Sequence, residues 1–223
     1  MTDDWLKKWT EKKITLALEL ERGQCNGSYA EAVIILCSVI SAIAADIWPG
    51  EGIDRKRFVE LLTEYSDESL HLKRVSIPLL ISYLRKNGST KEIEILTKRF
   101  MPSCHTLVIT GDDVDKYEQE IFSVCPKLVL KTVRANSYAN ILYKEVRCGY
   151  VHQYTTGDRA ESWPMSSKNE HGYVSYVNRA DLPDRLIYFD TNWLVKVIHS
   201  IVNKLDDKIN EITNKSFNNW WLK

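Results

Sequence analysis

The chain has 223 residues, of which 44% are hydrophobic and 27% charged, and its 30 basic residues balance 30 acidic ones. This composition excludes a disordered chain and a uniformly basic nucleic-acid coat, but a balanced total leaves room for a local basic patch. With only 9 Gly and 6 Pro the chain does not suit an all-β sandwich, and its length predicts one domain over residues 1–223.

The start of the chain predicts a peripheral helix followed by a central one. Residues 1–23 form an N-terminal helical extension, because 4–22 have the Leu, Glu, Lys and Ala content of a helix. Ser28 and Glu31 have the spacing of a capping box, so a second helix should cover 29–47. That helix is apolar nearly all round and is expected at the centre of a bundle.

The middle of the chain continues with helical periodicity. Asp54 and Ser89 or Thr90 are expected to cap helices, Pro78 should kink a helix, and Pro126 should divide another. The predicted helices cover residues 54–65, 69–85, 90–100, 112–136 and 137–151.

The pattern changes near the C-terminus. Residues 173–177 and 185–189 are short, β-branched and aromatic, which predicts a β-hairpin inserted at about 170–190. A last long helix follows over about 192–213, and Trp220 and Trp221 pack back onto the bundle or into a partner surface. The expected fold is mainly α, a helical bundle with a small inserted β-hairpin before the last long helix.

Targeting and cysteine patterns favour the cytoplasm. The five Cys include no C-x-x-C pair, so reduced thiols are expected rather than a disulfide framework. The N-terminus lacks the charged-then-apolar order of a signal peptide. The apolar run 30–48 contains Glu31, Ser38, Ser41 and Asp46, and we interpret it as a buried helix with no membrane role.

Searches for common cofactor and metal motifs find nothing. The chain has no phosphate-binding Gly-x-x-x-x-Gly-Lys-Ser/Thr, no Gly-x-Gly-x-x-Gly, no Gly-x-Ser-x-Gly and no His-Glu-x-x-His. The five His are scattered rather than spaced as ligands. We therefore expect no cofactor and no metal.

One segment has residues suited to RNA cleavage. Arg147 and His152 stand five positions apart at the end of a predicted helix. An imidazole can take a proton from a 2′-hydroxyl near neutral pH, and a guanidinium can grip phosphate oxygens. Ideal helical geometry separates the two side chains by roughly 140°. Either Gly149 loosens the last turn, or the side chains meet across a symmetric dimer.

The segment Arg147-Cys-Gly-Tyr-Val-His152 with Tyr154 resembles the HEPN superfamily, in particular the Arg-x-x-x-x-His-x-Tyr form of its toxins. The resemblance implies a metal-independent endoribonuclease, a toxin or defence effector, that is a homodimer with its active site at the interface. It assigns phosphate binding to Arg147 and proton transfer to His152. Tyr154 matches a position that a partner nucleotidyltransferase antitoxin modifies with AMP in some pairs. Cys148 departs from the family, where a polar residue, often Asn, follows the Arg.

Other residues have weaker assignments. Asp46 lies late in an apolar helix, so it either pairs with an Arg near the site or simply ends the helix. Arg55 and Arg57, with Lys144, either contact RNA or form a solvated helix face.

Two other interpretations of the whole chain stay open. One is a non-catalytic HEPN-like module that binds nucleotide or RNA or serves as a dimeric scaffold. In the other, Arg147 pairs with Glu145 or Asp158, and His152 packs under the following loop.

Overall fold

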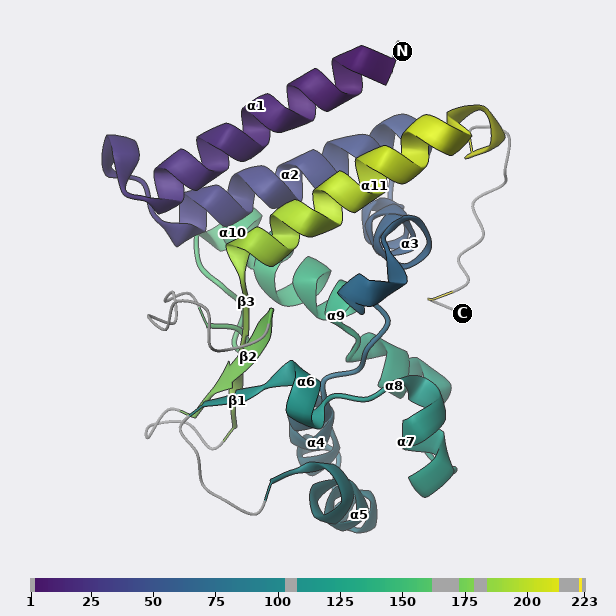
Figure 1. Ribbon diagram of the computed structural model, residues 1–223. Helices are drawn as coiled ribbons and strands as arrows, with labels where there is room; N and C mark the ends of the chain where they lie inside the picture. The colour runs from purple at the N-terminus through teal and green to yellow at the C-terminus, as the bar shows by residue number, and fades with distance from the viewer. Residues whose placement is uncertain (1–2, 103–107, 162–172, 179–183, 213–220, 222–223) are drawn as a thin grey trace.

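The computed structural model describes residues 3–102, 108–161, 173–178, 184–212 and 221. About 69% of it is helical, with one small antiparallel sheet, which confirms the mainly α prediction. Figure 1 shows three long helices crossing together on one side of the molecule, with the sheet and the shorter helices on the other. These three helices are α1 (Asp3–Glu21), α2 (Tyr29–Ile47) and α11 (Thr191–Ile212).

Helix α2 is the centre of the larger hydrophobic core. Ser28 and Glu31 form the predicted capping box at its start, and ten of its residues are buried. The helix packs against α1, α3 (Asp54–Tyr65), α10 (Cys148–Gln153) and α11. Contrary to the sequence expectation, α2 is long and apolar enough to cross a membrane by length and composition. The same properties are required of a helix packed on several sides in a core.

A second, smaller core lies under the first. It consists of α4 (Ile77–Lys86), α5 (Thr90–Phe100), α7 (Glu118–Val124) and α8 (Leu130–Ala135). The prediction of a kinked helix over 69–85 is wrong. A short 3₁₀ turn, Glu68–Leu70, is followed by a second turn, in which the Arg74 N–H donates to the His71 carbonyl oxygen, and by an isolated bridge at Val75. Pro78 stands in the first turn of α4, where its missing N–H costs nothing.

The predicted helix over 137–151 is present but irregular. It runs as α9 (Tyr138–Ile141), a π-helical segment η3 (Leu142–Arg147) and α10 (Cys148–Gln153). Such wide turns are rare and often found at functional sites. This helix carries Lys144, Arg147 and His152, so its packing positions most of the candidate residues.

The predicted hairpin is present, and an additional strand joins it. The sheet order is β1-β2-β3, with β1 (Val108–Thr110), β2 (Val174–Val177) and β3 (Leu186–Phe189) all antiparallel. Residues 179–183 of the hairpin lie outside the described residues. A four-residue helix, α6 (Gly111–Val114), follows β1.

A buried carboxyl group ties the sheet to the long helix. Asp115 is 2% exposed and accepts hydrogen bonds from the hydroxyls of Tyr138, on α9, and Tyr176, on β2. The backbone N–H of Ile77 donates to its other oxygen at 2.9 Å. Burial raises the pKa of Asp115 to about 7 despite these donors.

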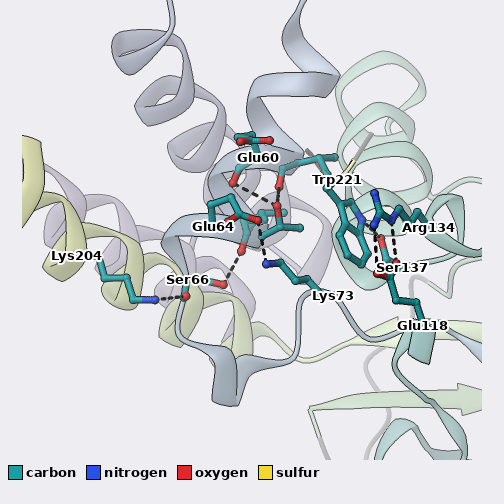
Figure 2. Close-up of polar contacts among 12 residues, drawn as sticks. Glu60, Glu64, Ser66, Lys73, Glu118, Arg134, Ser137, Lys204 and Trp221 are labelled. Carbon is teal, nitrogen blue, oxygen red and sulfur yellow. Dashed lines mark hydrogen bonds and ion pairs between the residues drawn. The ribbon is translucent and has the colours of Figure 1, made fainter. Parts of the chain in front are cut away.

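Trp221 packs onto the helices, as one of the two sequence alternatives proposed. Trp221 is 1% exposed, and its indole nitrogen donates to the Ser137 hydroxyl at 2.9 Å. The Arg134 guanidinium lies 4.9 Å from the centre of the indole and also pairs with Glu118 at 2.8 Å (Figure 2). Trp220 lies outside the described residues.

Candidate functional site

Arg147 and His152 lie on one uninterrupted stretch of helix. The helix continues through Gly149 to Gln153, so Gly149 does not loosen the last turn as the sequence suggested. Regular geometry then separates the two side chains by roughly 140° around the axis. On an ideal helix the two side chains therefore leave the backbone in different directions.

Gly149 has a packing role instead. A Cβ atom there would lie 2.4 Å from the carbonyl oxygen of Thr155 and 2.8 Å from the nitrogen of Gly157. The loop that follows the helix thus lies directly on its last turns. Gly157 also donates its N–H to the carbonyl oxygen of Glu145, at 2.6 Å, which fixes the loop against η3.

The same loop provides the ionic partner of Glu145. Arg159 reaches Glu145 through two nitrogens at 2.8 Å and donates to the side chain of Asn136 at 2.9 Å. Glu145 is therefore occupied by Arg159 rather than by Arg147. This removes the pairing with Glu145 that the structural alternative assigned to Arg147.

Arg147 is half-buried but retains hydrogen-bonding capacity. Its guanidinium carbon lies 5.4 Å from the centre of the Tyr143 ring, and its buried Nε has no hydrogen-bond partner within the described parts of the chain. Burial raises the pKa of the Cys37 thiol to about 12. The positive charge of Arg147 partly opposes this rise, because it stabilises the thiolate. The guanidinium is held in place by an aromatic face rather than by a carboxylate.

His152 lies at the exposed end of α10, not under the loop. Val151 and Tyr154, close to it in sequence, are 45% and 61% exposed, so two large hydrophobic side chains are accessible on this end of the helix. Tyr154 ends the helix in the left-handed conformation, with φ of 56°, which is uncommon for a residue with a side chain. Cys148 is partly buried and interacts with the Tyr143 hydroxyl, whose pKa burial raises.

The remaining predicted residues separate into two groups. Asp46 is exposed, so the burial cost that singled it out does not arise. Arg57 pairs with Asp54 and donates to the carbonyl oxygens of Trp48 and Gly50. These contacts join the start of α3 to the preceding loop. Asp54 is accordingly the first residue of α3 rather than its cap.

Arg55 and Lys144, by contrast, line the same cavity. It has a volume of about 690 Å³ and lies between α3, α4, α8, η3 and the loop after α10. We call it the basic cavity, because seven cationic side chains and no carboxylate line it among the residues that the structure describes. These cations are Arg55, Lys56, Lys86, Lys131, Arg134, Lys144 and Arg159.

Most of the basic cavity was missed by sequence reasoning. Its lining runs from Gly52 to Trp221, and no local motif joins Lys86, Lys131 and Arg159. The one available signal was the cluster around Arg55. The others come together only because the two cores meet here.

Comparisons with known proteins leave the family open: no family model, no curated protein and no solved structure matches the chain. Among the described residues, no three His, Cys, Asp or Glu side chains form a group that could hold a metal ion.

Proposed function

We propose that the protein is a metal-independent endoribonuclease whose active site is completed by a second copy of the chain. The observation that carries the proposal is the state of Arg147: a guanidinium fixed over Tyr143, without a carboxylate partner in the described residues, five positions before an exposed His152. Desolvated, unpaired guanidinium groups are costly unless an anion binds them.

The chemistry requires only these two groups and the RNA. His152 takes the proton of the 2′-hydroxyl, and the 2′-oxygen attacks the neighbouring phosphorus. Arg147 binds the phosphate oxygens, on which negative charge accumulates. The bond from phosphorus to the 5′-oxygen breaks, and that oxygen receives a proton from an imidazolium. The products are a 2′,3′-cyclic phosphate and a 5′-hydroxyl.

A second copy resolves the angular separation of the pair. In a two-fold dimer, the Arg147 of each chain can face the His152 of the other, because the same surface patch meets itself. The exposed Val151 and Tyr154 provide apolar contact area next to His152. The exposed Tyr154 hydroxyl is also accessible to a modifying antitoxin, the partner that the HEPN resemblance implies.

The test is cleavage of a labelled, structured RNA in EDTA. We expect the wild type to cut and to leave cyclic phosphate ends, and His152→Ala and Arg147→Ala to lose at least 100-fold in rate. His199→Ala is the matched control, since His199 lies on α11 and pairs with Glu11 instead. Equal rates for all four proteins, or cleavage only with added metal, would overturn the proposal.

The basic cavity favours a second candidate, a non-catalytic module that binds a nucleotide or RNA. It would bind its ligand without Arg147 or His152, neither of which lines the cavity. Failure to cleave any RNA together with tight binding of such a ligand would favour this function.

A further inference from the structure

We infer that the basic cavity is a binding site for a compact ligand that carries several phosphates, distinct from the Arg147–His152 site. The inference does not depend on ribonuclease activity. It concerns side chains that the sequence analysis mostly did not single out, and its ligand class follows from their charge and arrangement.

The charge balance of the cavity is strongly positive. Arg134 pairs with Glu118, and Arg159 pairs with Glu145, both at 2.8 Å. These are the carboxylates directly behind the seven lining cations, which leaves a surplus of five positive charges. Asp184 lies near the rim, where it accepts from Ser82 and pairs with Arg85.

The surplus charges are free to bind an anion. Among the described residues Arg55 donates to the amide oxygen of Asn140 alone, at 3.0 Å. Lys144 lies 3.8 Å from Glu145, which already pairs with Arg159. Lys56, Lys86 and Lys131 are exposed and make no ion pair with any described residue. Like charges repel one another at such a site, and a polyanion relieves that repulsion.

Two arginines of the cavity are held by ion pairs, whereas its lysines are exposed. Arg134 is 9% exposed and is clamped between Glu118 and the indole of Trp221 (Figure 2). Arg159 is held by Glu145 and Asn136. Glu118 accepts from two nitrogens of Arg134, and Glu145 and Asn136 engage all three nitrogens of Arg159. An added polyphosphate therefore binds mainly the five surplus cations, whose lysines are exposed.

The shape favours a compact ligand over a nucleic-acid strand. Small-molecule sites typically measure roughly 300–1,000 Å³, a range that includes this cavity of about 690 Å³. Its cations come from four helical elements and one loop and line a single hollow. A strand that tracks a groove would need charges spread along the groove.

The experiment is calorimetric titration with inorganic tripolyphosphate and with a nucleoside triphosphate, at 150 mM salt. If both bind with similar affinity, the cavity recognises the phosphates alone. If the nucleoside triphosphate binds more tightly, the cavity also contacts the nucleoside. We expect Lys86→Glu and Lys131→Glu each to weaken binding by about tenfold. Lys98→Glu, an exposed lysine of α5 outside the cavity, is the charge-matched control and should leave affinity nearly unchanged.

Two results would overturn the inference. One is no binding of either polyphosphate by a protein whose thermal unfolding is cooperative. The other is binding that all three reversals weaken equally, which would indicate attraction to net charge alone. A 12-nucleotide single-stranded RNA serves as competitor: if it binds more tightly than tripolyphosphate and is lost with the same substitutions, the cavity is an RNA site and the compact-ligand assignment is wrong. His152→Ala should not alter any of these affinities, which separates this test from that of the ribonuclease.

Discussion

The basic cavity and the Arg147–Tyr154 segment share one helix but are built in opposite ways. Cavity residues come from distant parts of the chain, and ion pairs hold two of its three arginines in place within a single copy. The segment places Arg147 and His152 five positions apart, at the last residue of η3 and within α10, where ideal helical geometry turns them in different directions. If both proposals hold, the comparison teaches that one site can be complete within a single chain while a motif beside it needs a second copy.

Arg159 is the residue that joins the two regions, and its loss should have the largest effect on stability. It lines the cavity, pairs with the buried Glu145 and fixes the loop after His152. Arg159→Ala leaves that carboxylate without its main partner, which we expect to cost about 3–5 kcal/mol of unfolding free energy. Denaturant unfolding measures this. Arg85→Ala, at an exposed pair with Asp184, is the control and should cost less than about 1 kcal/mol.

Asp115 anchors the start of the shared helix through Tyr138, so it should affect both regions alike. Burial raises its pKa from 3.8 to about 7, which means that the folded protein binds this proton more tightly than the unfolded chain. Stability should therefore fall as the pH rises from about 4 to about 7, by up to about 4 kcal/mol. Asp115→Asn should flatten this dependence in denaturant unfolding measured across that window. A wild-type curve that rises with pH and is unchanged in the variant would contradict the assignment.

Gly149→Ala tests the loop that covers the segment. Alanine in a helix ordinarily stabilises it relative to glycine, but here the added Cβ would meet the Thr155 carbonyl at 2.4 Å. We expect a loss of about 1–3 kcal/mol, because backbone rather than a movable side chain must shift. The free energy of tripolyphosphate binding to the cavity should change by less than the free energy of unfolding does. A gain in stability would show that the loop does not lie against the helix.

His152→Ala should have the smallest effect on stability, within about 0.5 kcal/mol, because the side chain is exposed. The same substitution should abolish RNA cleavage. Thermal unfolding and cleavage measured on one preparation separate these effects. A large loss of stability would instead assign His152 a structural role.

Local signals in the sequence predicted the elements well. Ser28 and Glu31 specify a helix start through neighbouring atoms, and the hairpin strands are recognisable from their own residues. Pro78 was misinterpreted, since a proline inside an apolar run suits either a kink or a first turn, and tertiary packing selects between them.

The candidate site was only partly predictable for the same reason. Arg147, His152 and Lys144 form a short pattern on one helix, which a sequence displays directly. The pairing of Glu145 with Arg159 and the gathering of Lys86 and Lys131 depend on how two cores dock, and no spacing in the chain encodes that.

The most direct test of the account mixes two inactive variants. Arg147→Ala and His152→Ala are purified separately, combined under conditions that allow subunit exchange, and assayed on RNA in EDTA. If each site takes Arg147 from one chain and His152 from the other, half of the dimers are mixed and each has one intact site, so about a quarter of the wild-type activity should return. No recovery, with exchange confirmed by a mass-tagged copy, would contradict a site shared between two chains.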